Sequence, residues 1–402
     1  MAEAGNERTR VGAEQDRQKV ILSIWSWHIS GINTFALRLA SALKNRLALE
    51  PEILCGHPPP PGLAAFFEEL QIPVVVGPWE PSAFIRFGKS HLRGRVPLAF
   101  VAKGPFDFEM ARVLSTRTRL WFWSHGLGPN WESVILTATG FGADICIPNK
   151  GQYLVFRKRM PRYGKFHCAP LWVDAIDPRP APVQGPLLLV HSGRLDQDTK
   201  RVALGIELAT LLRQRKVAFR LDYLGEGPHR KVLEKTIHGQ GLEPWVRLLP
   251  AVPPQSLGAR LTGYHMVLSF SKRESFGLAV LEGMAAGLRP LCLEPEQGLD
   301  FLHDRPDLQA LAPDVSVMAD RIAALAEGNT AVAEPAFRQG LADWTIARFG
   351  IEAALPLLRR LATETEGSPP AAPGWFRRTG TLIRLKLLCA RAARRARAFR
   401  KQ

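Results

Sequence analysis

The feature that most constrains the fold is a regular alternation of short apolar runs with amphipathic segments, which begins at residue 19. The segment 33–46 (NTFALRLASALKNR) places its apolar residues at near-helical spacing, and the runs around it are rich in Val, Ile, Leu and aromatic residues. Such alternation predicts β-α units, with a parallel sheet covered by helices on both faces. We expect strands at KVILSIW, PEILCG, IPVVVG, VPLAFVAKG, RLWFWS and ADICIP.

The alternation breaks at a proline-rich stretch, WVDAIDPRPAPVQGP, and then starts again. The second series of predicted strands is PLLLVHSG, FRLDYLGEG, WVRLLP, HMVLSFS and RPLCLE. A chain of 402 residues is also too long for one ordinary domain. We therefore predict an α/β protein with two Rossmann-like domains that face each other across a cleft. They cover residues 19–175 and 186–350, are joined near 174–185, and are followed by a C-terminal helix at 351–364.

The two ends of the chain differ from this body. Residues 1–18 are polar and charged without an apolar stretch, so we expect a disordered tail and no secretory signal. No run approaches the roughly 18 apolar residues of a membrane-spanning helix. The five cysteines are widely spaced and contain no C-x-x-C pair, which favours a reducing compartment over disulfides or a zinc site. These features predict a cytoplasmic protein.

Behind a proline- and glycine-rich linker at 365–376, residues 377–402 form a basic tail. The net charge of the chain is +16, and ten of these charges lie in the tail, which leaves +6 on the body. We predict an amphipathic helix that lies on an anionic membrane surface, where each basic residue contributes about 1 kcal/mol. The alternative is a tail that packs on the body or on a protein partner. Nucleic-acid binding is not expected, because no aromatic and basic groove accompanies the charge.

The stretch 271–290, SKRESFGLAVLEGMAAGLRP, places one carboxylate before an apolar helix and a second one inside it. A core helix needs neither Glu274 nor Glu282. We expect Ser275 to cap a helix over 276–286 at the carboxyl end of a strand, where ligands of open sheets bind. The amides and the helix dipole there favour a phosphate, held by the backbone of Ser275, Phe276, Gly277 and Leu278. The alternative is a pair of solvated glutamates on an amphipathic helix.

A second motif, GRLDQDTK, follows the first predicted strand of the second domain. Arg194 offers a planar fork to phosphate oxygens and Lys200 a point charge, and both are expected to face the phosphate site. As an alternative, each is a solvated surface charge. Asp196 and Asp198 spell D-x-D between the two cations, but we interpret them as solvated and predict no metal.

These motifs occur in the order GRLDQDTK, LGEGPHRKVLE, ESFGLAVLE and LEGMAAG. In that order they resemble glycosyltransferase family 4, the retaining nucleotide-sugar transferases with the GT-B fold. The resemblance covers most of residues 20–360 and is sharpest over 186–290. It implies that Arg194 and Lys200 bind the donor diphosphate, that Glu274 contacts the transferred sugar, and that Glu282 binds the ribose hydroxyls. It further implies that Gly277 lets the backbone approach the phosphate.

The first domain resembles the family less closely. Gly31, in HISGINTFALRLASAL, corresponds to the family's glycine loop near the phosphate or the sugar, and His28 lies in the same loop. His125, in WFWSHGLGP, follows a strand where the family often has a histidine near the donor sugar. Asp174 is interpreted as a hinge or capping residue. The stretch LCLEPEQGLDFL departs from the family's glycine pair and Glu.

The resemblance implies a hexosyltransferase that moves a hexose from UDP- or GDP-hexose to a hydroxyl of a glycan or glycolipid acceptor, with retention of the anomeric configuration. We expect no cofactor. The tail suggests a role in lipopolysaccharide or polysaccharide synthesis, peripheral to the inner face of the cytoplasmic membrane. Two alternatives are a nucleotide-sugar epimerase of the same fold and a non-enzymatic, nucleic-acid-binding scaffold. The order of the four motifs speaks against both.

Overall fold

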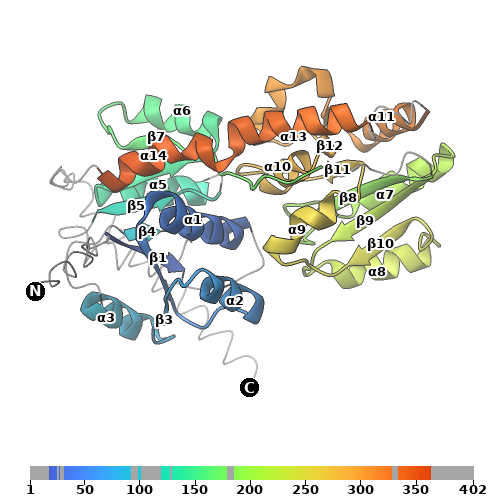
Figure 1. Cartoon of the computed structure of the whole chain (residues 1–402). Helices are drawn as coiled ribbons and strands as arrows, with labels where there is room; N and C mark the ends of the chain where they lie inside the picture. Colours follow the sequence, from blue (N-terminus) through green and yellow to red (C-terminus); the bar gives the residue numbers. More distant parts are fainter. Residues whose placement is uncertain are drawn as a thin grey trace, which may run out of the picture.

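The computed structural model describes residues 18–24, 27, 31–91, 98–100, 119–126, 129–178, 185–327 and 334–363. The predicted N-terminal tail up to residue 17, the linker at 365–376 and the basic tail at 377–402 lie outside the described residues. The described chain contains two parallel sheets with helices packed around each, so the α/β prediction is confirmed (Figure 1).

The first sheet has seven strands in the order β3-β2-β1-β4-β5-β6-β7, and every pair is parallel. In strands β1, β2, β5 and β6 nearly every residue is buried, which explains their largely apolar sequences. The strands are β1 (Lys19–Ile24), β2 (Glu50–Cys55), β3 (Val74–Val76), β4 (Leu98–Phe100), β5 (Leu120–Trp123), β6 (Asp144–Ile147) and β7 (Phe166–Cys168). The helices are α1 (Gly31–Leu47), α2 (Pro61–Glu69), α3 (Pro81–His91), α5 (Pro129–Gly140) and α6 (Lys150–Arg159).

The second sheet has six parallel strands in the order β10-β9-β8-β11-β12-β13. The strands are β8 (Leu187–Ser192), β9 (Phe219–Leu224), β10 (Val246–Leu249), β11 (Met266–Ser269), β12 (Arg289–Leu293) and β13 (Leu311–Ala312). Its helices are α7 (Leu204–Gln214), α8 (Arg230–Gly239), α9 (Pro254–Leu261), α10 (Leu278–Ala285) and α11 (Val315–Glu327), with 3-10 turns at Asp300–Asp304 and Pro306–Leu308. In both sheets the chain order reverses beside the first strand, β1 or β8. Such switch points are where open parallel sheets bind ligands.

Two final helices connect the two sheets. Helix α13 (Pro335–Phe349) lies beside α10, whereas α14 (Ile351–Thr363) lies over the first sheet near α1 (Figure 1). Within α14, Glu352 pairs with Arg46 of α1, and Arg360 lies 2.8 Å from His167 of β7. The chain therefore returns to the first sheet after completing the second one.

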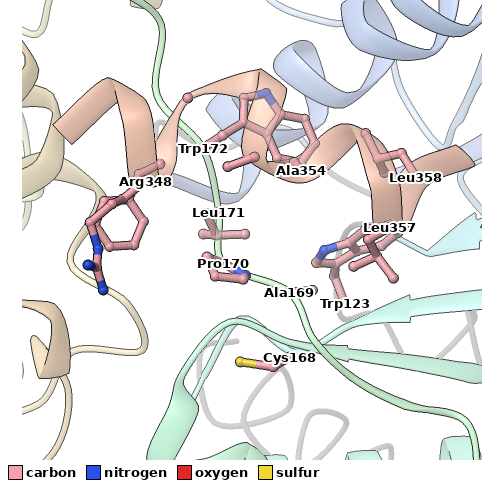
Figure 2. Close-up of a pocket in the computed structure, with 13 residues that line it drawn as sticks. Trp123, Cys168, Ala169, Pro170, Leu171, Trp172, Arg348, Ala354, Leu357 and Leu358 are labelled. Carbon is pink, nitrogen blue, oxygen red and sulfur yellow. The ribbon is translucent and has the colours of Figure 1, made fainter. Parts of the chain in front are cut away.

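The segment that leaves the first sheet passes beneath the joint between α13 and α14. The Val173 amide donates a 2.8 Å hydrogen bond to the carbonyl of Phe349. Between this segment and the joint lies a cavity of about 60 Å³, lined by Trp123, Cys168, Trp172 and Leu358 among others (Figure 2). It is large enough for a few water molecules and too small for a nucleotide sugar.

One hydrophobic cluster runs through both halves of the molecule. It includes Phe35 of α1, Trp172 of the connecting segment, and Phe276 and Leu281 from the α10 region. Because buried apolar area stabilises a contact by roughly 25 cal/mol per Å², this shared cluster holds α1 against α10. In the described part of the chain, no helix is both long and apolar enough to cross a membrane.

Candidate functional site

The site is built around the loop between β11 and α10. This loop carries Glu274, and α10 carries Glu282. The helix begins later than predicted, at Leu278 instead of residue 276, and its N-cap is Gly277. The prediction of Ser275 as the cap is therefore wrong. The reason is that Phe276 turns into the core against Phe301 and Phe349, which keeps the chain out of helical geometry until Gly277.

Gly277 is required at the start of α10 for two reasons. Its φ of +92° lies in the left-handed region, which favours glycine. In addition, a Cβ at this position would lie 2.2 Å from Leu299 Cδ2. The helix that follows points its N-terminal amides out from the carboxyl end of the sheet. Anions bind well at such a terminus.

Glu274 is held by contacts that converge on one carboxylate oxygen. Oε1 forms an ion pair with Lys200 and accepts a 2.6 Å hydrogen bond from the Ser271 hydroxyl. The Glu274 amide donates to the Gln297 carbonyl over 3.0 Å, which joins this loop to the loop after β12. The Glu274 side chain is 12% exposed, so the alternative of a solvated glutamate does not hold here.

Lys200 reaches Glu274 because its loop, which follows β8, is fixed at both ends. The Asp196 carboxylate accepts a 2.8 Å hydrogen bond from the Thr199 amide, and the Lys272 amide donates to the Thr199 carbonyl over 2.8 Å. Asp196 is thus occupied in shaping the loop, and Asp198 is exposed. Among the described residues, no group of three or more His, Cys, Asp or Glu side chains is arranged to hold a metal ion.

Arg194 is placed differently from Lys200. Its side chain is exposed, and within the described part of the chain its guanidinium forms no ion pair. The backbone beside Arg194 nevertheless packs closely against the loop with the sequence LGEGP. A Cβ at Gly225 would lie 1.9 Å from the Gly193 carbonyl oxygen, and one at Gly227 would lie 2.3 Å from that of Leu195. The glycines of LGEGP therefore let two loops meet backbone to backbone at the base of the site.

Glu282 lies on the face of α10 that meets the first domain. It is 6% exposed, and its Oε1 lies 3.0 Å from Nη2 of Arg38 in α1. The Nε of Arg38 also donates to Asp174 Oδ2 over 2.8 Å. Burial raises the pKa of Glu282, and the positive charge of Arg38 counteracts this increase. Arg38 was not predicted from the sequence. A signal was available, because Arg38 is a single arginine between Leu37 and Leu39, on a helix that begins at the candidate loop glycine Gly31.

The N-termini of α1 and α10 approach each other. A Cβ added at Gly31, the first residue of α1, would lie 3.6 Å from Leu278 Cδ2 at the start of α10. His125 follows β5 and packs against Phe35 of α1, with ring centroids 5.5 Å apart. The structure thus brings the predicted residues Gly31 and Leu278 close together, whereas His125 lies against the side chain of Phe35 in α1. His28 lies outside the described residues.

A further histidine, His191 in β8, was not predicted. It is fully buried, and its Nδ1 lies 3.2 Å from the Leu268 carbonyl. Burial, together with the nearby charge of Lys200, lowers the pKa of His191 to about 4. The ring is therefore neutral at physiological pH and places no second positive charge behind Lys200.

Comparisons with known proteins agree with this architecture. Residues 174–305 match the family model described as "Glycosyl transferases group 1". No curated protein matches the sequence. Among solved structures, TarM of S. aureus, bound to Fondaparinux, alpha-GlcNAc-glycerol and UDP, has a TM-score of 0.69 at 12% identity. This alignment covers 86% of the present chain and 100% of the TarM chain.

Two further structures give similar values. The pneumococcal O-GlcNAc transferase GtfA, in complex with UDP and GlcNAc, has a TM-score of 0.68 at 12% identity, over 87% of this chain and 100% of its own. HepE of Anabaena, in complex with UDP and glucose, has a TM-score of 0.67 at 15% identity, over 86% and 100%. At sequence identities this low, the structural likeness shows a common fold and nothing more. The chain therefore has the GT-B fold of these glycosyltransferases, and its residues 174–305 match the glycosyl transferases group 1 family.

Proposed function

We propose that this protein is a retaining hexosyltransferase that moves a hexose from a nucleotide sugar to an acceptor hydroxyl. The observation that carries the proposal is the pairing of Lys200 with Glu274 beside the N-terminus of α10. A cation, a carboxylate and a row of backbone amides at the carboxyl end of a parallel sheet suit a ligand with both a diphosphate and a sugar. The family match over 174–305 supports the same chemistry.

In this proposal the second domain stabilises the leaving diphosphate. As the bond between the anomeric carbon and the phosphate oxygen breaks, negative charge grows on the diphosphate. Lys200, Arg194 and the amides at the start of α10 interact most strongly with that developed charge, which lowers the barrier. The exposed guanidinium of Arg194 is accessible to a diphosphate that enters from solvent.

Glu274 and Glu282 have separate roles in this proposal. The two side-chain contacts of Glu274 in the described part of the chain meet at Oε1. In the proposal, the other carboxylate oxygen accepts hydrogen bonds from hydroxyls of the sugar. Glu282, at the interface of α10 with α1, binds the ribose. His125 and Gly31 complete the sugar side from the first domain. The reaction is proposed to need no metal.

The nucleotide is proposed to be UDP or GDP. UDP is favoured, because TarM, GtfA and HepE are described in complex with UDP. The acceptor is proposed to be a glycan or glycolipid of the cell envelope. The lipopolysaccharide outer core galactosyltransferase WaaB supports this, with a TM-score of 0.59 at 14% identity over 87% of this chain and 100% of its own. The basic tail would hold the enzyme at the inner membrane face.

The test is a donor screen with the full-length protein. UDP-glucose, UDP-galactose, UDP-GlcNAc and GDP-mannose are each incubated with the enzyme and a lipid-linked glycan fraction, and nucleotide release and glycan products are measured. We expect one donor to give a product whose anomeric configuration, read by NMR, is that of the donor. Chelator should leave the rate unchanged. Conversion of the donor sugar without transfer would indicate an epimerase, and a mobility shift with nucleic acid at physiological salt would indicate the scaffold alternative.

A further inference from the structure

The buried contact between α1 and α10 carries an inference about how the donor site is assembled. Arg38 belongs to the first sheet's domain and is 9% exposed, while Glu282 of the second domain is 8% exposed at the side chain. Arg38 also contacts Asp174, which lies on the segment that leads from one sheet to the other. A single guanidinium therefore contacts both domains and their connection.

This ion pair leaves hydrogen-bonding capacity unmet. Although Arg38 Nη2 lies 3.0 Å from Glu282 Oε1, the two are not aligned for a hydrogen bond, and Oε1 has no hydrogen-bond partner among the described residues. Nη1 of Arg38 is likewise buried without one in the described part of the chain. Buried polar groups without partners are costly, each by about 1–3 kcal/mol. A hydroxyl both donates and accepts, so one ligand hydroxyl could serve both groups.

We infer that Arg38 is a positioning residue of the donor site, which keeps Glu282 oriented and negatively charged so that nucleoside hydroxyls are bound only when α1 is seated against α10. The inference rests on the proposed function, because it assigns the partner that Glu282 needs for its role. The binding site for the nucleoside then belongs to both domains, and not to the second domain alone.

The electrostatics of the site support this role. Burial raises the pKa of Glu282 and Arg38 lowers it, while Asp174, the other charged group that faces it, raises it. Arg338 of α13 packs against the same helix, but its guanidinium is directed to the Ala286 carbonyl at the far end of α10. Without Arg38, the pKa of Glu282 would be higher. The carboxyl group would then already be protonated at a pH at which the wild-type group is ionised, and it would be a weaker acceptor. Raising the pH would then restore it.

The experiment measures UDP and GDP binding by calorimetry between pH 6.5 and 9, with the full-length protein. Relative to wild type, Arg38→Met should bind about tenfold more weakly or worse at pH 6.5. The loss should shrink as the pH rises, because Glu282 becomes ionised again. Arg46→Met is the matched control, since it removes an exposed cation from the same helix, and we expect wild-type affinity at each pH.

A second comparison keeps the test valid if Arg38→Met does not fold. Glu282→Gln and the double variant Glu282→Gln with Arg38→Met leave no uncompensated buried carboxylate. If Arg38 acts through the charge of Glu282, the two should bind the nucleotide equally, within about threefold. A double variant that binds more than tenfold more weakly than Glu282→Gln would overturn the inference.

The inference and the proposed function fail in different ways. Wild-type protein that binds neither UDP nor GDP would contradict the proposed function, and the inference with it. Wild-type protein that binds nucleotide while Arg38→Met binds it equally well at pH 6.5 would overturn the inference alone. A loss in Arg38→Met that is the same at every pH would also overturn it, because the role would then be packing.

Discussion

The Ser271 hydroxyl donates a 2.6 Å hydrogen bond to Glu274 Oε1, the same oxygen that pairs with Lys200. Ser271 itself is buried and lies two residues after the end of β11. The carboxylate is therefore fixed from the sheet on one side and from the β8 loop on the other. A carboxylate held in this way is oriented before any substrate arrives, which is what electrostatic catalysis requires of Glu274 in the proposed function.

Loss of either donor-side cation should slow the reaction. Lys200→Ala and Arg194→Ala should each lower kcat/KM by about 10²-fold or more, because each removes a contact to the leaving diphosphate. Lys231→Ala, which removes an exposed charge from α8, is the matched control and should retain the wild-type rate. If both site variants turn over normally with the correct donor, the phosphate assignment is wrong.

The two glutamates should give different kinetic profiles. Glu282→Ala should mainly raise the KM for the donor, because ribose contacts are similar in the ground state and the transition state. Glu274→Ala should mainly lower kcat, because the sugar near the reacting carbon changes most during the reaction. Steady-state kinetics with the donor varied distinguishes the two. Identical profiles would remove the reason for giving the two carboxylates separate roles.

Gly277→Ala should destabilise the second domain. The substitution forces a side chain into a left-handed conformation with φ of +92° and places its Cβ 2.2 Å from Leu299 Cδ2. Strain of this kind costs about 1–3 kcal/mol. Gly340→Ala is the control, because that position in α13 has open space and alanine favours helices. Urea unfolding should show Gly277→Ala less stable and Gly340→Ala as stable as wild type or more so; equal midpoints for Gly277→Ala and wild type would contradict the strain argument.

A buried carboxylate in the first domain should make stability depend on pH. Asp144 pairs with Arg119 and with His167, whose other ring nitrogen faces Arg360 of α14. Burial alone would raise the pKa of Asp144, but the hydrogen bonds and charges of His167 and Arg119 outweigh burial and lower it. The stabilisation is thus present above the unfolded pKa of about 3.9 and is lost as the pH falls through the lower folded value.

Asp144→Asn should therefore lower the free energy of unfolding by about 3 kcal/mol at pH 7, since it breaks a buried pair. The difference from wild type should shrink as the pH falls below about 4. Denaturant unfolding between pH 3 and 7 measures it. Asp304→Asn, which breaks the exposed pair with Arg348, is the control and should change stability by less than about 1 kcal/mol. A difference that stays constant with pH would rule out the ionic contribution.

The basic tail should bind anionic membranes. Deletion of residues 370–402 should release the protein into the soluble fraction while nucleotide binding is retained, since every residue of the proposed donor site precedes residue 370 in the sequence. Co-sedimentation with anionic and neutral liposomes at low and high salt is the measurement. Binding should weaken with salt, because charge attraction fades within about 8 Å at physiological ionic strength. Equal binding to both kinds of vesicle would leave the tail as a packing or partner-binding element.

Much of the fold could be predicted from the chain itself. Every predicted strand has a counterpart, because runs such as PLLLVHSG and HMVLSFS contain an apolar stretch of the kind that a strand buried in a parallel sheet needs. Two strands were not predicted, β7 and β13, with the sequences FHC and LA. Both are short edge strands that exist because a neighbouring strand offers backbone partners, and such pairing leaves no pattern in their own sequence.

For the candidate site, too, the sequence predicted one part and the tertiary structure decided another. The residue types and the order of GRLDQDTK and ESFGLAVLE predicted that Lys200 and Glu274 belong to one site, and in the structure the two side chains form an ion pair. The start of α10 was predicted two residues too early. Ser275 could cap the helix only if Phe276 were its first residue, but Phe276 packs against Phe301 and Phe349 in the core instead. These partners are distant in sequence, so local capping rules could not include them.

The sequence by itself determined the two-sheet architecture and the set of charged residues of the proposed phosphate site, since both follow from local periodicity and from spacing within single loops. Only the tertiary structure decided that Glu282 is buried against Arg38 and tied through it to Asp174. Arg38 and Glu282 lie in different domains. Whether two charges so far apart in the chain form a pair depends on how α1 packs against α10. That packing is the sum of many apolar contacts between the domains, which no short stretch of sequence contains.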